Sequence, residues 1–148
     1  MSTSLLDPAQ ADVSALRQLD QYPFDQVRAQ LLADGMEPAT VERSIEELRK
    51  YFKLIAHGYR DLGMTSPEVD AAWHALILHT RDYAEFCQSV FGRFIHHRPL
   101  RGAEVADVAP AANLHRAYSA VFGTPDPRVW QEVTKCNGGG KCQSCQDE

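Results

Sequence analysis

Residues 38–58 read PATVERSIEELRKYFKLIAHG, and this stretch decides the fold class. Its apolar residues recur at steps of three and four, which is the spacing of one face of an α-helix. They are Val41, Ile45, Leu48, Phe52 and Ile55. Charged residues, Glu47 among them, occupy the opposite face, while Pro38 favours a helix start and Gly58 a helix stop. The stretch therefore predicts a long amphipathic helix that buries one side in a helical core.

The segments before and after this helix carry further helix-start signals, each a capping side chain or a proline. These signals stand at Asp7–Pro8, Pro23, Ser66–Pro67, Thr80, Pro110 and Asp126–Pro127. No segment alternates apolar and polar residues as an exposed strand does. We therefore expect one all-α domain, a compact bundle of five to seven helices over residues 5–133. A flexible tail rich in glycine and cysteine is expected over residues 134–148.

Composition excludes several classes of function. The 148 residues are 44% apolar and 24% charged, as in an ordinary globular protein. A net charge of −5 argues against binding nucleic acid through its phosphates. No apolar run approaches the ~20 residues that cross a bilayer, and the N-terminus lacks the features of a secretion signal. We expect a cytoplasmic protein without a membrane partner, whose cysteines stay reduced.

Histidine and cysteine are concentrated between residues 67 and 99. Asp70 and His74 are four residues apart on one predicted helix, so they face the same way. A carboxylate there could orient a metal-bound His74, or it could simply satisfy a buried histidine. Cys87 falls on the apolar face of the next helix, and His96 follows that helix. If His74, Cys87 and His96 converge, they suit zinc, or iron or copper; otherwise no cofactor is implied.

The C-terminal tail holds three cysteines, Cys136, Cys142 and Cys145. Two residues separate Cys142 from Cys145, a spacing that lets both thiolates reach one metal ion. A fourth ligand would have to come from Cys87 or a histidine. The alternative is a tail with three free thiols, able to capture metal or form a redox disulfide.

One string of residues resembles a known family. It comprises Trp73-His74, Tyr83 with Cys87 four residues later, Phe91-Gly92, and His96 with Pro99 three residues later. The string resembles the glycine-rich domain-containing protein-like family, whose short bacterial members have no established activity. Plant members of that family are longer and sometimes contain RNA-binding segments. This chain contains no such segment, so an RNA-binding role is not implied. Family members often carry a second histidine where this chain has Leu76, so a His-x-His metal site is not implied here.

Three hypotheses of function follow from the sequence. The first is a small metal-binding or redox-responsive protein that uses the histidine and cysteine set. The second is a non-catalytic module that binds a protein partner and in which Asp70, Trp73 and His74 form a structural polar core. An enzyme using Cys87 or a metal on His74 ranks last, because no residue set supplies a nucleophile, a base and an oxyanion site together.

Overall fold

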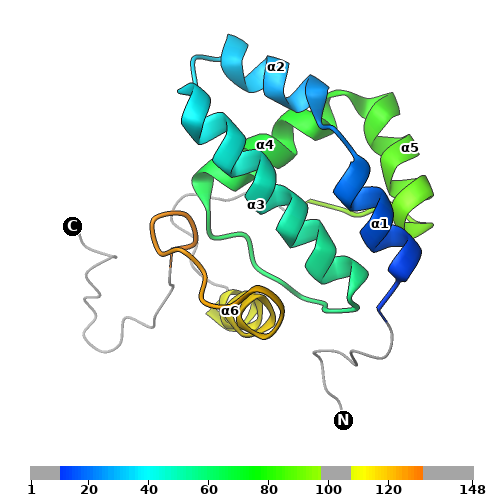
Figure 1. Cartoon of the computed structure of the whole chain (residues 1–148), viewed down its shortest axis with the longest axis vertical. Helices are drawn as coiled ribbons and strands as arrows, with labels where there is room; N and C mark the ends of the chain where they lie inside the picture. The colour runs from blue at the N-terminus through cyan, green and yellow to red at the C-terminus, as the bar shows by residue number, and fades with distance from the viewer. Residues whose placement is uncertain (1–10, 98–107, 132–148) are drawn as a thin grey trace.

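The computed structural model describes residues 11–97 and 108–131, and within these ranges it contains six helices and no strand. The helices are α1 (Val13–Gln21), α2 (Asp25–Ala33), α3 (Pro38–Ala56), α4 (Pro67–Leu78), α5 (Thr80–Phe91) and α6 (Val108–Phe122). Helix α3 crosses the middle of the molecule, and α1, α2, α4 and α6 all pack against it (Figure 1). The predicted all-α class and number of helices are confirmed. The tail that begins at residue 134 lies outside the described residues.

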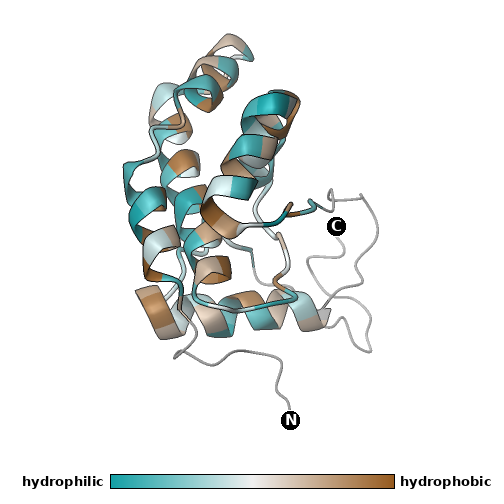
Figure 2. Cartoon of the chain, turned by 90° about the vertical axis from the view of Figure 1, so that its right-hand side faces the viewer, coloured by the Kyte–Doolittle hydropathy of each residue, from teal (hydrophilic) through white to brown (hydrophobic). Residues whose placement is uncertain are grey.

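The helices carry apolar residues on their inward sides and polar residues on their outward sides, so most show both colours in Figure 2. This amphipathic pattern makes burial of the inward faces the main favourable contribution to folding. None of the described helices is both long enough and apolar enough to cross a membrane.

Several helix ends follow the predicted capping chemistry. The Ser66 hydroxyl accepts a hydrogen bond from the Val69 amide at 3.2 Å and caps α4, as expected. Gly92 ends α5 with a φ of 71°, a conformation that side chains larger than hydrogen disfavour. The first described helix, however, begins at Val13, and its cap is Asp12. The predicted cap, Asp7, lies outside the described residues.

Three helix starts differ from the prediction. Helix α2 begins at Asp25 and not at Pro23, and its N-cap residue Phe24 has a left-handed φ of 55°. Thr80 does not cap α5 but is its first residue, because His79 ends α4 and begins α5 without a side-chain cap. Helix α6 starts at Val108, two residues before Pro110. The predicted turn after Asp126 is present, since the Asp126 carbonyl accepts from the amides of Val129 and Trp130.

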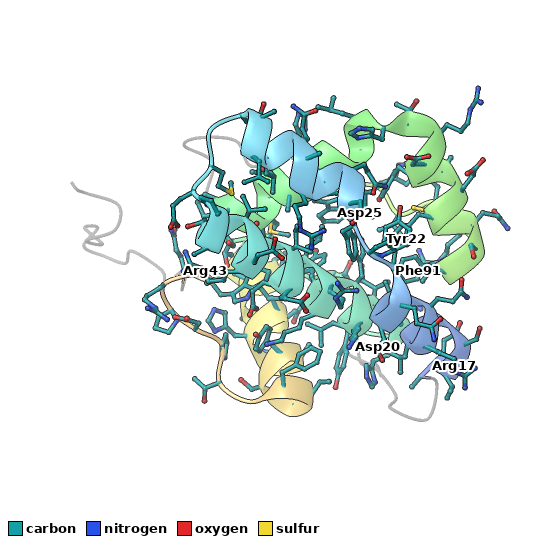
Figure 3. All side chains as sticks on the ribbon, turned by 45° about the horizontal axis from the view of Figure 1, so that its top comes forward. Arg17, Asp20, Tyr22, Asp25, Arg43 and Phe91 are labelled. Atoms are coloured by element: carbon teal, nitrogen blue, oxygen red, sulfur yellow. The ribbon has the colours of Figure 1, made fainter. Side chains whose placement is uncertain are left out.

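Arg49 fixes the joint between α1 and α2. Its Nη1 donates to the carbonyls of Leu19 and Tyr22, at 2.6 and 2.8 Å. Its guanidinium also lies 5.0 Å from the centre of the Phe24 ring. Figure 3 shows Tyr22 at this joint, on the side of the molecule that carries α5. The charged side chain of Arg49 therefore helps to hold the fold together from the inside.

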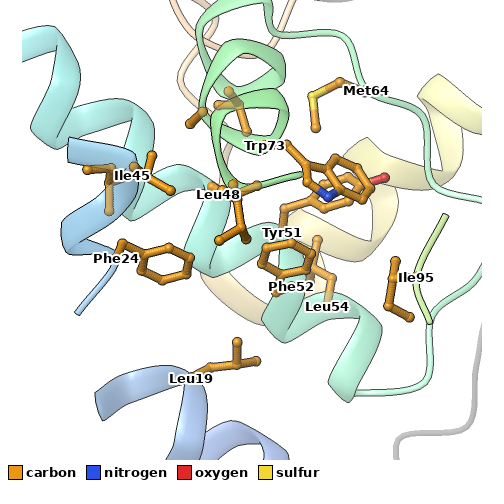
Figure 4. Packing of buried hydrophobic residues seen from close by; sticks show 14 of the residues in the cluster. Leu19, Phe24, Ile45, Leu48, Tyr51, Phe52, Leu54, Met64, Trp73 and Ile95 are labelled. Atoms are coloured by element: carbon orange, nitrogen blue, oxygen red, sulfur yellow. The ribbon is translucent and has the colours of Figure 1, made fainter. Parts of the chain in front are cut away.

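The core is built around α3 (Figure 4). Most of the predicted apolar face is buried, since Val41, Ile45, Leu48 and Phe52 are each fully shielded from solvent, while Ile55 is only partly buried. Leu54 and Tyr51 are buried as well, because helices pack on more than one side of α3. For the same reason Glu47, which the sequence pattern places on the polar face, is only 9% exposed.

Candidate functional site

The residues proposed as metal ligands do not come together in the described structure. His74 and His96 are exposed, whereas Cys87 is fully buried in the core. Within residues 11–97 and 108–131, no three His, Cys, Asp or Glu side chains form a group that could hold a metal ion. The other proposed ligands, Cys136, Cys142 and Cys145, lie outside the described residues.

The buried partner of Asp70 is His97 and not His74. His97 Nε2 lies 2.9 Å from Asp70 Oδ1, and the His97 side chain is only 5% exposed. The His97 ring also stacks on Trp73, with 4.2 Å between ring centres and an interplanar angle of 29°. The structure therefore does not bring the candidate residues Asp70, His74, Cys87 and His96 into one buried cluster. The polar core consists of Asp70, Trp73 and His97, which we call the Asp-Trp-His core.

The pattern of exposure along residues 94–97 indicates why His97, and not His96, is buried. Residues 94–97 are irregular and follow the end of α5. Their exposure alternates, since Ile95 and the His97 side chain are buried while Phe94 and His96 are exposed. Alternate side chains of an extended segment point to opposite sides. The apolar residue two positions before His97 was the signal that could have identified it.

Tyr83 anchors the same segment from α5. Its hydroxyl accepts a hydrogen bond from Trp73 Nε1 at 3.1 Å and donates one to the Ile95 carbonyl. Burial raises the pKa of Tyr83, and the hydrogen bond with Cys87 raises it further, against the opposing effect of Trp73. Tyr83 therefore stays a neutral donor. Cys87 beside it is fully shielded, so its sulfur is out of reach of a dissolved substrate.

A second buried polar group joins α3 to the C-terminal part of the described chain. Glu47 Oε1 accepts hydrogen bonds from the Tyr118 hydroxyl at 2.6 Å and from Trp130 Nε1 at 2.8 Å. Lys50 Nζ lies 3.4 Å from the other carboxylate oxygen. Burial, followed by the bond to Glu47, raises the pKa of Tyr118. A tyrosine and a tryptophan in a predicted core each need a hydrogen-bond acceptor. This requirement was the signal in the sequence that could have indicated a buried role for Glu47.

A groove lies on the surface between α1 and α5, and we call it the α1–α5 groove. Its volume is about 410 Å³. The residues that line it are Gln18, Gln21, Tyr22, Pro23, Asp82, Glu85, Phe86, Ser89 and Val90. The sequence alone does not reveal the groove, because its two walls are about sixty residues apart in the chain and only tertiary packing brings them together.

Hydrogen bonds and ring contacts fix both walls of the groove. Gln18 Nε2 donates to the Ser89 carbonyl at 3.1 Å, and the Ser89 hydroxyl donates to Gln18 Oε1 at 2.6 Å. The Tyr22 ring lies 4.7 Å from that of Phe24 and 4.8 Å from that of Phe86. Burial raises the pKa of Tyr22, the hydrogen bond with Gln26 opposes this, and the negative charges of two acidic residues on α5 add to the rise. The groove is therefore formed before anything binds to it.

Comparison with known proteins identifies the family. A family model described as UCP032817-like matches residues 14–121, which is more than half of the chain. The chain belongs to the UCP032817-like family. The resemblance to the glycine-rich domain-containing protein-like family is therefore wrong, and nothing is carried over from it. UCP032817-like proteins form an uncharacterised family. Searches of curated proteins and of solved structures returned no match.

Proposed function

We propose that this UCP032817-like protein is a non-catalytic protein-binding module, and that its binding surface is the α1–α5 groove. The observation that carries the proposal is a groove with preformed walls, in which Pro23 is exposed and Tyr22 partly exposed, whereas Phe86 and Val90 are buried. A concave site that combines a few apolar side chains with polar groups is typical of binding sites. Rigid walls favour binding, because less conformational entropy is lost when a partner docks.

The buried polar groups support a binding module in preference to an enzyme. Glu47 accepts hydrogen bonds inside the fold, and His97 lies against Asp70 and Trp73, while the buried His97 Nδ1 has no hydrogen-bond partner among the described residues. Such groups hold elements together when their hydrogen-bonding capacity is used within the protein. The surface left for function on the described residues is therefore a docking surface, and a cytoplasmic protein partner is the expected occupant.

Site-specific photo-crosslinking in living cells tests this proposal. A photoreactive amino acid is placed in the full chain at Gln21, which lines the groove, or at Gln88, an exposed residue of α5 that does not line it. We expect a discrete crosslinked protein from position 21 and none from position 88. Mass spectrometry of the crosslinked band then identifies the partner. Equal crosslinking from both positions, or none from position 21, would refute a binding role for the groove.

We further propose, as a second candidate function, that the tail captures a transition metal through Cys136, Cys142 and Cys145. The supporting observation is the two-residue spacing of Cys142 and Cys145, which suits zinc. Elemental analysis of the full chain, purified under reductant without a histidine tag, provides the test. We expect zinc, iron or copper in the wild type and its loss in the Cys142→Ser/Cys145→Ser variant. His74→Ala and His96→Ala serve as controls that keep the metal, and trace metal in the wild type would overturn the idea.

A further inference from the structure

We infer that the Nδ1 atom of His97 supplies the fourth ligand of a metal ion held by the three tail cysteines, Cys136, Cys142 and Cys145. The inference rests on the second candidate function, metal capture by the tail, and names the residue that completes the site. The ion, for which zinc is the best match, then joins the tail to the Asp-Trp-His core. Two observations carry this inference, an unused ring nitrogen in that core and the place where the described chain ends.

The His97 ring is buried, yet only one of its nitrogens has a polar neighbour. The side chain is 5% exposed, and Nε2 lies 2.9 Å from Asp70 Oδ1. Nδ1 is shielded from solvent and has no hydrogen-bond partner among the described residues, and Asp70 Oδ1 likewise lacks a directed hydrogen bond there. Buried polar atoms are almost always paired, so each exception calls for an explanation, and a bound ion is one of them.

The pair of Asp70 and His97 has the chemistry of a metal-ligating histidine. A histidine that binds a metal through one ring nitrogen usually has a carboxylate beside the other nitrogen, which keeps the proton there. The Asp70 carboxylate favours the proton on Nε2 of His97, which leaves the lone pair of Nδ1 free to coordinate. Three thiolates and one imidazole form a closed tetrahedral site for zinc. The tail supplies the three thiols and lacks the imidazole.

The other candidates for a fourth ligand lack this arrangement. His74 and His96 are exposed, and among the described residues neither forms an ion pair with a carboxylate. Cys87 is fully buried inside the apolar core. His115 Nε2 is buried without a partner, but no described carboxylate forms an ion pair with its ring. Within the described chain, His97 therefore combines a carboxylate at one nitrogen with an unused second nitrogen.

His97 also lies within reach of the tail. Trp130, one residue before the end of the described chain, has its ring centre 6.1 Å from that of Tyr51. The Tyr51 ring lies 5.2 Å from that of Trp73, beside which Figure 4 shows it, and Trp73 stacks on His97 at 4.2 Å. Cys136 is six residues beyond Trp130, and an extended chain covers about 3.3–3.6 Å per residue. The reach of those six residues exceeds the length of this row of ring contacts.

Cadmium-113 NMR on the full chain identifies the ligands without any substitution. The chain, purified without a histidine tag and kept under reductant, is loaded with cadmium in place of zinc. A spectrum that correlates the metal nucleus with protons shows which side chains bind it. We expect correlations to the β protons of Cys136, Cys142 and Cys145 and to the ring protons of His97. Correlations to the cysteines alone, or to the ring of a different histidine, would overturn the inference.

The melting temperature gives a second readout, because a ligand in the folded core couples metal binding to folding. At a free zinc concentration of about 100 times the Kd, zinc should raise the melting temperature of the wild type by at least about 5 °C. His97→Phe keeps a ring against Trp73 but removes the ring nitrogens, so it should lose this rise. His96→Phe, the matched change at the exposed neighbour, should keep it. Circular dichroism confirms that each variant is folded.

These outcomes separate the inference from the function on which it rests. If zinc binds through the tail cysteines but leaves the melting temperature of the wild type unchanged, metal capture by the tail stands and the role of His97 fails. An equal rise in the wild type and in His97→Phe would refute that role as well. If neither zinc nor cadmium binds the full chain, both proposals fail. If His97→Phe does not fold, the cadmium correlations of the wild type decide alone.

Discussion

At the residue scale, the clearest determinant is a carboxylate inside the core. Glu47 is buried and satisfies two aromatic donors, whereas its neighbour Glu46 has a side chain that is 58% exposed. Removing the acceptor leaves the Trp130 indole N–H buried without a partner and the Tyr118 hydroxyl without an acceptor, since Lys50 only donates to that hydroxyl. An unmade buried hydrogen bond costs more than a made one contributes. Two adjacent glutamates therefore have very different energetic roles.

We predict that Glu47→Ala lowers the free energy of unfolding by about 2–4 kcal/mol. Glu46→Ala, on the exposed side of the same turn, should change it by less than about 0.5 kcal/mol. Glu47→Gln should fall between them, because its amide oxygen can still accept from Trp130. Urea denaturation followed by tryptophan fluorescence measures all three. A cost for Glu46→Ala that equals that of Glu47→Ala would contradict this account.

At the scale of elements, the segment that leaves α5 is docked by side chains and not by helical hydrogen bonds. Tyr83 holds the Ile95 carbonyl, and Asp70 and Trp73 hold His97. Tyr83 lies on α5, whereas Asp70 and Trp73 lie on α4, so the segment joins the two helices after the chain has left α5. Of the two adjacent histidines, only His97 takes part in this docking.

His97→Ala should therefore lower the melting temperature and the free energy of unfolding, by about 1–3 kcal/mol. His96→Ala and His74→Ala, which remove exposed imidazoles, should stay within about 0.5 kcal/mol of the wild type. Differential scanning calorimetry at one pH compares the three variants. A large loss for His74→Ala with none for His97→Ala would restore the assignment made from sequence.

At the scale of the whole molecule, buried phenols link folding to alkaline pH. Burial raises the pKa of Tyr22, Tyr83 and Tyr118 above the ordinary value of 10.0. Above about pH 10 the unfolded chain loses these protons while the folded chain keeps them. The unfolded state then binds fewer protons, so the free energy of unfolding must fall as the pH rises.

We predict that the contribution of these phenols to the free energy of unfolding is constant below about pH 9. Between about pH 10 and 12 the free energy of unfolding should decline steadily. Tyr83→Phe and Tyr118→Phe should each make the decline less steep, whatever their effect on stability at neutral pH. Urea titrations at a series of pH values give the slope, and absorbance at 295 nm reports tyrosinate in folded and unfolded protein. A slope that neither substitution changes would show that other groups govern alkaline unfolding.

The sequence alone determined the class of fold and most helix ends. The spacing of Val41, Ile45, Leu48 and Phe52 specifies α3, and Ser66 and Gly92 specify helix boundaries, because backbone hydrogen bonding and capping involve residues close together in the chain. Such signals are local, so they can be recognised without knowledge of the rest of the molecule.

Only the tertiary structure decided which polar residues matter. The sequence does not distinguish Glu47 from Glu46, or His97 from His96. Which residue of each pair is buried depends on groups distant along the chain, among them Trp130, Tyr118 and Asp70. The α1–α5 groove likewise exists only because helices far apart in sequence pack side by side. The free energy of a buried polar side chain depends on the partners that surround it, and folding alone supplies them.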